Sequence, residues 1–274
     1  MFKSLNGLDV VLIPGTGILD DFGERPVGMP YMLFVVSLFA KIRRIKVAFV
    51  SAGAGPIVHP LSRWFMKMAA RMATYRSFRD EISKDYMGSI GVNVARDLVY
   101  PDLAFGLSDP ELVEPRSQKQ LTIGLGVMAY YGWSAGDETV YATYISKISA
   151  FAVWLLNSGY RIRLLVGEPT DQCAVNDLQK AVSEQIGSLP EGMLVTDEQH
   201  SLHDIMAQIA SVDAVVATRF HNVLCALKVG KPTISLGYAE KNDVMMAAMG
   251  LGAFCQHVER MDVDKLIAQF KELI

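Results

Sequence analysis

The sequence predicts an α/β fold with two domains, each built around a parallel sheet. Short apolar runs alternate along the chain with longer segments of helical periodicity, a pattern that is typical of strand–helix units. A polar stretch at 108–120 contains Pro110 and Pro115, lacks apolar periodicity, and predicts a linker between domains at 1–107 and 121–274. The 274 residues are enough for two modest domains.

Four strands and three helices are expected in the first domain. The strands are short apolar runs, and the helices carry apolar residues at helical spacing. Glycine-containing turns at 15–17 and 53–56 follow the first two strands, where the chain turns away from the sheet. In chain order, the expected elements are strand 8–13, helix 30–39, strand 46–51, helix 62–74, short strand 75–78, a helix that ends at residue 86, and short strand 97–100.

The second domain is expected to repeat the same alternation and to end in an amphipathic helix. Because its strands are separated by helices, its sheet should be parallel, as in Rossmann-like domains. In chain order, the expected elements are strand 121–127, loop 128–136, helix 138–158, strand 161–166, helix 174–186, strand 193–195, helix 202–209, strand 213–217, a helix opened by Asn222, strand 233–236 and helix 262–273.

Composition excludes several classes of protein. The formal net charge of −3 and the absence of a recognised nucleic-acid motif disfavour a nucleic-acid partner. Cys173, Cys225 and Cys255 are unclustered, so they are interpreted as reduced packing residues of a cytoplasmic protein and not as a metal site or disulfide frame. The strongest membrane-span candidate, 31–40, is much shorter than the roughly 20 residues that a spanning helix needs, and no cleavable signal peptide is evident.

The charge is distributed unevenly along the chain. Residues 1–80 carry eleven Lys and Arg against five Asp and Glu, and the helical segment at 62–77 places cations beside Trp64 and Phe65. Such a helix can rest on an anionic membrane surface, which would make the protein peripheral at the inner face of the membrane. In the commoner alternative, both aromatic side chains face the core and the cations face water.

The most informative polar residues follow two neighbouring strands of the second domain. Arg219 and His221 come directly after strand 213–217, and Tyr238 and Lys241 follow strand 233–236. Ligands of open α/β sheets lie at the carboxyl ends of the strands. A guanidinium fork and a helix N-terminus at Asn222 suit a small anion, while a histidine can transfer protons near neutral pH.

A structural alternative accounts for the same residues without a ligand. Arg219 would then pair with a local carboxylate such as Asp213, and His221 would cap the helix that follows it.

These segments, in this order, resemble the polysaccharide pyruvyl transferase family. The C-terminal signature is RFH after an apolar strand, then a short helix, GKP, a second strand and GYxxK ending at Lys241. IPGTGILDD at 13–21 is similar to the family's glycine-rich turn. FRDEIS at 78–83, GV at 91–92 and PDLAF at 101–105 are similar to its RDxxS…GV…DPAF run, with Pro-Asp here in place of Asp-Pro. The resemblance implies a GT-B-like pair of Rossmann-like domains.

The resemblance also implies a reaction and a set of roles. A pyruvate ketal would be formed from phosphoenolpyruvate on a saccharide, which belongs to a cell-surface polysaccharide or its precursor and is lipid-linked in one version of this hypothesis. Arg219, the Asn222 helix N-terminus and Lys241 would bind the donor anion, and His221 would transfer protons. Neither a metal nor a redox cofactor is required. Arg79 would close on the donor from the first domain; its structural alternative is a salt bridge to Asp80 or Glu81.

Weaker candidates have equally simple structural explanations. Gly15 and Gly17 suit a phosphate cradle or an ordinary tight turn. Gly126 and Tyr130 belong to the first strand–helix loop of the second domain, where an aromatic ring can stack on a sugar or pack in a cluster. Glu168, after strand 161–166, is a candidate polar contact for the acceptor. His200 and His203 lack a third metal ligand, so no metal site is predicted.

One departure from the family keeps other functions open. The family's first strand, its GNxGD-like turn and the following helix are missing before the strand at 8–13, so the first domain is expected to be partial. A nucleotide-sugar glycosyltransferase of the same architecture is the main alternative, with Arg219 and Lys241 on a diphosphate. A non-catalytic, anion-binding remnant is the other. The sequence indicates neither the acceptor sugar nor an oligomeric state.

Overall fold

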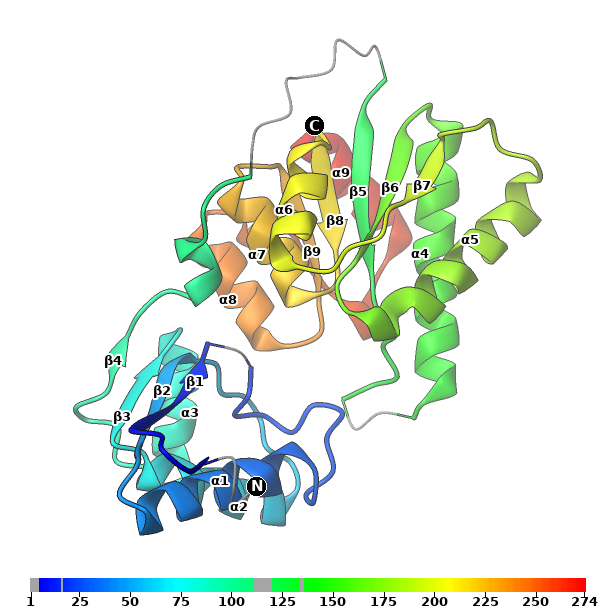
Figure 1. The fold of residues 1–274 in the computed structure, drawn as a ribbon. Helices are drawn as coiled ribbons and strands as arrows, with labels where there is room; N and C mark the ends of the chain where they lie inside the picture. Colours follow the sequence, from blue (N-terminus) through cyan, green and yellow to red (C-terminus); the bar gives the residue numbers. More distant parts are fainter. Residues whose placement is uncertain (1–4, 16, 111–119, 134–135) are drawn as a thin grey trace. The chain divides into compact units, whose positions relative to one another are not determined.

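The computed structural model describes residues 5–15, 17–110, 120–133 and 136–274, and these form two compact units, Met1–Leu107 and Ser108–Ile274 (Figure 1). Each unit contains its own parallel sheet with helices between the strands, which confirms the predicted α/β class. Most of the predicted linker, 111–119, lies outside the described residues.

Unit 1 contains a four-stranded parallel sheet in the order β1-β2-β3-β4, so neighbours in space are also neighbours in sequence. Its elements are β1 (Val10–Pro14), α1 (Met29–Ile42), β2 (Lys46–Ala52), α2 (Pro60–Met72), β3 (Tyr75–Phe78), α3 (Glu81–Ser89), β4 (Leu98–Val99) and a short 3-10 helix (Leu103–Gly106).

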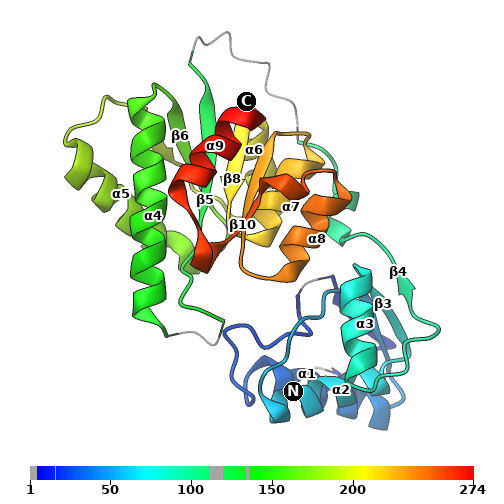
Figure 2. The ribbon, with the colours of Figure 1, turned by 180° about the vertical axis from the view of Figure 1, so that it is seen from behind.

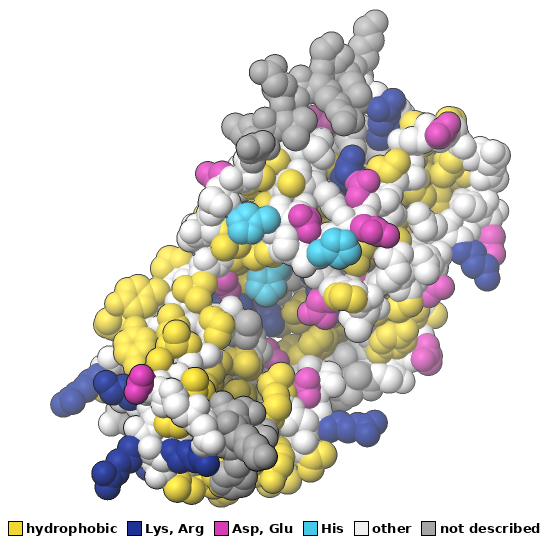
Figure 3. All heavy atoms as spheres, in the orientation of Figure 1, with side chains coloured by type: hydrophobic (Ala, Val, Ile, Leu, Met, Phe, Trp, Pro, Cys, Tyr) yellow, Lys and Arg dark blue, Asp and Glu magenta, His cyan; other side chains and the backbone are white. Residues whose placement is uncertain are grey.

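The helices of unit 1 lie on one face of its sheet (Figures 1 and 2). Because right-handed crossovers that step in one direction place every helix on the same side, this follows from the strand order. Val47 and Phe49 of β2 face this side and belong to the core. On the opposite face, Leu12 pairs with Ala48 and Ala48 with Tyr75, and Leu12 is 62% exposed. Figure 3 shows apolar side chains gathered over the strands of this unit.

The helix predicted to carry cations beside aromatic residues is α2. Phe65 is buried against Tyr31 and Phe34 of α1, while Trp64 packs on Phe34 and stays half exposed. The two aromatic residues therefore differ: Phe65 belongs to the core and Trp64 to the surface.

Unit 2 contains a six-stranded parallel sheet in the order β10-β9-β8-β5-β6-β7. This is the Rossmann order 3-2-1-4-5-6 read from the other edge, and the winding reverses between β5 and β8. Its elements are β5 (Thr122–Val127), α4 (Glu138–Asn157), β6 (Arg161–Val166), α5 (Gln172–Ile186), β7 (Leu194–Thr196), α6 (Leu202–Ala210), β8 (Ala214–Ala217), α7 (Phe220–Lys228), β9 (Thr233–Gly237), α8 (Glu240–Ala248), β10 (Cys255–His257) and α9 (Val263–Leu273).

Helices cover both faces of the unit 2 sheet. α4, α5 and α9 pack on one face, and α6 packs beside α7 on the other (Figures 1 and 2). In the part of the chain that the structure describes, α4 is the one helix long and apolar enough to cross a membrane by length and composition. Its buried residues, which include Tyr144, Ile148 and Phe151, belong to the core of this unit.

Three elements of unit 2 differ from their predictions. Helix α7 begins at Phe220, two residues before the predicted start, which puts Arg219 at the cap position. The sequence does not predict helix α8, because its apolar residues do not form a face, or strand β10, because its sequence CQH contains no apolar run. Lys241 therefore lies in the first turn of a helix instead of in a loop after a strand.

Candidate functional site

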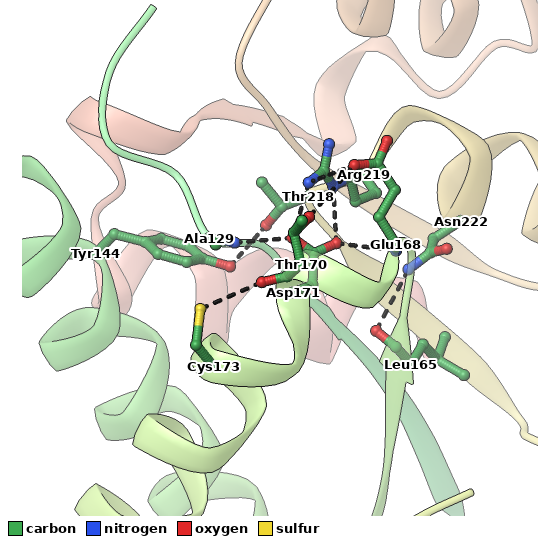
Figure 4. A network of polar contacts seen from close by, with 10 residues as sticks. All are labelled: Ala129, Tyr144, Leu165, Glu168, Thr170, Asp171, Cys173, Thr218, Arg219 and Asn222. Carbon is green, nitrogen blue, oxygen red and sulfur yellow. Dashed lines mark hydrogen bonds and ion pairs between the residues drawn. The ribbon is translucent and has the colours of Figure 1, made fainter. Parts of the chain in front are cut away.

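A cluster of buried polar groups lies where the winding of the unit 2 sheet reverses. Arg219, which follows β8, donates from Nε to Asp171 Oδ2 and from Nη2 to Asp171 Oδ1, both at 2.8 Å (Figure 4). Glu168 lies 3.2 Å from the same guanidinium, after β6. The guanidinium makes the two parallel hydrogen bonds expected of an arginine, but it makes them to a carboxylate of the protein itself. The partner is Asp171; Asp213 instead accepts from the Thr122 N–H.

Asp171 connects three loops of this cluster. Its side chain is completely buried and also accepts from the Ala129 and Glu168 N–H groups at 2.9 and 3.1 Å. Burial alone lowers the pKa of Arg219, but the hydrogen bonds and charge of Asp171, together with Glu168, outweigh it and raise that pKa above its ordinary value. Arg219 is therefore a fixed cation at the end of β8.

Close packing of backbone against side chain holds Arg219 in place. A Cβ atom at Gly167 would lie 2.6 Å from Arg219 Cγ, so the arginine stem requires glycine here. On the other side, Thr218 Oγ1 and Tyr144 Oη share a hydrogen bond of 2.9 Å. Both contacts fix the position where the chain leaves β8.

His221 and Lys241 approach the same aromatic ring. The ring of His221 meets Phe220 edge-on at 5.6 Å between centroids, and Lys241 Nζ lies 5.9 Å from the Phe220 centroid and 5.0 Å from that of Tyr238. His221 belongs to the first turn of α7, and the N-cap position is held by Arg219, so His221 is not the N-cap residue of this helix. The first turn of α7 thus carries a proton-transfer group, and Lys241 in the first turn of α8 lies near the aromatic ring that this group contacts.

Tyr130 does not offer its ring to a ligand. It is 1% exposed, packs near Tyr238 at 6.1 Å between centroids, and donates its hydroxyl to Glu259 Oε1 at 2.6 Å. Burial, reinforced by this carboxylate, raises the pKa of Tyr130. Of the two roles expected for Tyr130, packing in an aromatic cluster is the one that the structure shows, and stacking on a sugar is not compatible with its burial.

Gly126 and Asn222 also have packing roles. A Cβ at Gly126 would lie 2.8 Å from both Ala217 Cβ and Asn222 Nδ2, so this glycine lets α7 approach β5 closely. Asn222 is fully buried, and its Nδ2 lies 3.5 Å from the Leu165 carbonyl oxygen (Figure 4). Its side chain therefore points into unit 2 and not toward a ligand at the helix N-terminus.

The candidate residues of unit 1 form an internal network. Arg79 is buried, donates from Nη1 to Asp102 Oδ2 at 3.0 Å, and lies 3.6 Å from Asp80. Asp80 and Asp102 also cap the α3 helix and the 3-10 helix at Leu103–Gly106. The salt-bridge alternative is therefore present, and Asp102, which the sequence did not suggest, is the closer partner.

The glycine turn after β1 is closely packed. A Cβ at Gly15 would lie 2.8 Å from the Ser51 carbonyl oxygen, so the turn needs glycine for steric reasons. Gly17 follows it, before Leu19 forms an isolated bridge with Ala54.

Within the described residues, no group of three or more His, Cys, Asp and Glu side chains is placed to hold a metal ion. His203 instead lies with Nε2 3.3 Å from Ser108 Oγ, and His200 lies 3.9 Å from Glu198.

Three site features could not be foreseen from sequence spacing. Asp171 follows Glu168 at the spacing of a capping box, which indicates a helix start and not a partner for Arg219. Phe220, between Arg219 and His221, cannot be told from an ordinary apolar residue by its spacing. Gly167 gave no signal at all.

The buried tyrosines of unit 2 make its stability sensitive to alkaline pH. Burial raises the pKa of Tyr144 to about 12, and burial with a carboxylate partner also raises the pKa values of Tyr130 and Tyr141. Because these pKa values are raised in the folded state, the tyrosines contribute their full stabilisation of unit 2 below the ordinary tyrosine pKa of about 10. This stabilisation is lost as the pH rises through the folded values.

We expect the free energy of unfolding to fall above pH 10, by up to about 1.4 kcal/mol per pH unit for each such tyrosine. Urea unfolding between pH 9 and 11.5 measures this slope, and Tyr144→Phe should make it shallower. An unchanged slope in that variant would contradict the assignment.

Comparison with known proteins gives a family and a fold. A sequence model described as polysaccharide pyruvyl transferase matches residues 2–240. A search of curated proteins finds no significant match.

Among solved structures, a UDP co-structure of S. aureus MnaA is 13% identical, with a TM-score of 0.62, and the match covers 98% of this chain and 66% of that one. UDP-GlcNAc 2-epimerase from Methanocaldococcus jannaschii, in complex with UDP-GlcNAc and UDP, is 14% identical with a TM-score of 0.64, over 99% of this chain and 71% of that one. Trehalose 6-phosphate synthase from Burkholderia multivorans is 10% identical with a TM-score of 0.58, over 99% and 64%. At these identities the likeness shows the fold alone, which is the GT-B type predicted. The chain spans about two thirds of the length of these proteins.

Proposed function

Because this chain belongs to the polysaccharide pyruvyl transferase family, we propose that it forms a pyruvate ketal on a saccharide, with phosphoenolpyruvate as the donor. The acceptor is a cell-surface polysaccharide or its precursor. The observation that carries the proposal is that His221 contacts the Phe220 ring and that Lys241 Nζ lies 5.9 Å from the centroid of the same ring, while Arg219 directly precedes Phe220 in the chain.

The charges of this group suit a small trianion. Lys241 and the first turn of α7, which contains no acidic residue, offer positive charge to the phosphate and carboxylate, whereas the first turn of α8 also carries Glu240 and Asp243. Arg219 contributes a guanidinium held in a rigid position, although Asp171 and Glu168 offset its charge. The donor would therefore bind at the carboxyl ends of β8 and β9.

The reaction then needs one group that gives and takes protons, and His221 fills this role. The methylene carbon of the enol receives a proton, and a sugar hydroxyl adds to the neighbouring carbon and loses its own proton. The bond from that carbon to the phosphate oxygen breaks, inorganic phosphate leaves, and a second hydroxyl closes the ketal with loss of a proton. No redox step occurs, and the proposed chemistry requires neither a metal nor an organic cofactor.

Replacing Lys241 should weaken donor binding more than it slows turnover. A lysine acts on phosphate as a point charge, so Lys241→Ala should raise the Kd for phosphoenolpyruvate roughly ten- to a hundredfold, the effect of losing about 1.5–3 kcal/mol. The rate at saturating donor should change less. Calorimetry and phosphate-release kinetics measure the two effects, with Lys180→Ala on α5 as the control; equal losses in both would place Lys241 in the chemical step.

Donor binding also distinguishes this function from its alternatives. The solved structures of this fold that contain UDP or UDP-GlcNAc keep a nucleotide-sugar glycosyltransferase as the second candidate. Calorimetry with phosphoenolpyruvate, UDP and UDP-GlcNAc separates them. Binding of phosphoenolpyruvate, followed by phosphate release that depends on saccharide, would support pyruvyl transfer. Binding of UDP alone would support the glycosyltransferase, and no binding of either would support a non-catalytic remnant.

The location of the reaction is part of the same proposal. A cytoplasmic enzyme that acts on a lipid-linked acceptor works next to a membrane, and the exposed Trp64 beside the cations of α2 offers a surface for peripheral contact.

A further inference from the structure

Unit 2 contains a cavity of about 730 Å³ beside the proposed donor site. It lies between the carboxyl end of β6, the loop after β7 and the first turns of α6, and His221 forms part of its wall. Its volume falls within the range of about 300–1,000 Å³ that is typical of small-molecule sites. Every residue that lines it belongs to unit 2.

The charges around this cavity are unlike those of an anion site. Glu168, Asp197 and Glu198 line it, and none of its lining residues is a lysine or arginine. Behind the wall, Arg219 pairs with Asp171 and Glu168, and Arg163 pairs with Asp197. The cavity and its wall therefore contain four carboxylates and two guanidinium groups, and Glu198 lies 3.9 Å from His200 instead of pairing with an arginine. Figure 3 shows acidic and histidine side chains close together on this part of the surface. A phosphate or a second carboxylate would be repelled here.

The remaining lining suits a sugar ring. Val166, Leu202 and Ile205 provide apolar surface for the C–H face of a pyranose, and the carboxylates provide acceptors for its hydroxyls. The side chain of Glu168 is 58% exposed, and its Oε2 lies 3.2 Å from Arg219 Nη2. Because a carboxylate has several lone pairs, Glu168 can accept from Arg219 and from a sugar hydroxyl at the same time.

We propose that this cavity binds a sugar ring of the acceptor, and that the ring carries no negative charge. The inference rests on the proposed function, because it makes His221 the residue shared by the donor site and the acceptor site. It adds the chemical class of the acceptor: a neutral or amino sugar is accepted, whereas a uronic acid or a phosphorylated sugar is rejected at this position. It also places nucleotide diphosphates outside this cavity.

Matched pairs of sugars test the charge rule. Methyl β-glucoside and methyl β-glucuronide share a ring and differ in one carboxylate, and methyl galactoside, methyl mannoside and N-acetylglucosamine extend the neutral set. With protein labelled at isoleucine methyl groups, we expect at least one neutral sugar to shift the Ile205 signal. The glucuronide should bind at least about tenfold more weakly. Equal binding of both members of the pair, or no response of Ile205 to any neutral sugar, would overturn the proposal.

A charge reversal on the rim supplies the second test. The side chain of Glu198 is 93% exposed, so Glu198→Lys should fold normally and should reduce the preference for neutral sugar over glucuronide by about tenfold. Glu184→Lys on α5 makes the same change of net charge outside the cavity and should leave the preference unchanged. Equal effects in the two variants would show a general charge effect and would overturn the proposal.

Phosphoenolpyruvate binding, measured on the same samples, separates the two hypotheses. Sugar binding without phosphoenolpyruvate binding would contradict the proposed reaction and would still support the sugar cavity. Phosphoenolpyruvate binding with no sugar in the cavity would contradict the sugar cavity and would still support the proposed reaction.

Discussion

Replacing His221 with alanine should lower the rate of phosphate release about 10²- to 10⁴-fold and leave the affinity for phosphoenolpyruvate nearly intact. The reason is the position of His221: it contacts Phe220, which Lys241 also approaches, and it lines the adjacent cavity. It can therefore reach a donor at α7 and α8 and an acceptor hydroxyl in the cavity. The measurement is phosphate release with saturating donor and acceptor, beside calorimetric donor binding.

The control is His203→Ala, which removes an exposed histidine of the same unit outside the cavity wall. It should change neither the rate nor the affinity. If His221→Ala only lowered the melting temperature and kept its rate, His221 would be a structural residue, and the proposed proton transfer would lose its carrier.

Removing Asp171 should destabilise unit 2 by about 3–5 kcal/mol, because it leaves the guanidinium of Arg219 without its buried partner. Arg219→Lys should also be harmful, since an ammonium group cannot make the two parallel hydrogen bonds. The Arg219→Lys variant should also bind the donor more weakly than the original protein, because a lysine side chain would not be fixed in place at the end of β8.

Unfolding of unit 2 can be followed separately from that of unit 1. In a Trp64→Phe background, the remaining tryptophans, Trp133 and Trp154, both lie in unit 2, so their fluorescence in urea reports its unfolding. Asp197→Ala is the matched control, because it breaks a more exposed carboxylate–arginine pair and should cost at most about 1 kcal/mol. A loss for Asp171→Ala no larger than this control would contradict the buried network.

The arrangement of unit 2 could largely be predicted because its strands are local apolar runs. The runs at β6, β8 and β9 have glycine, proline or charged residues close to both ends, and β5, β6, β8 and β9 all lie within a residue or two of their expected limits. Helix α8 lacked such a signal, since its sequence EKNDVMMAA has no apolar stripe. Its position comes from packing against β9, which is a tertiary interaction.

The site was predicted less completely, because its partners are distant in sequence. The arginine, histidine and lysine were identifiable from the positions of the strand ends, whereas the carboxylate that holds Arg219 lies 48 residues earlier in the chain. A distant partner also decides the position of Tyr130, in this case by burying a side chain that could have faced a ligand. Its loop suggested exposure, but Glu259 binds its hydroxyl from 129 residues away and keeps it in the core.

The sheet of unit 1 is wound in one direction only, and this determines how it can be extended. A further parallel strand beside β1, reached by a step in the opposite direction, would place its helix over the face that carries Leu12 and Tyr75. The loop after β1 would then become a reversal point, the place where such sheets bind ligands. Gly15 would keep its steric role against Ser51, and its turn would open onto that site. Whether this turn binds a ligand is thus decided by its neighbouring strands, and its own sequence is compatible with both states.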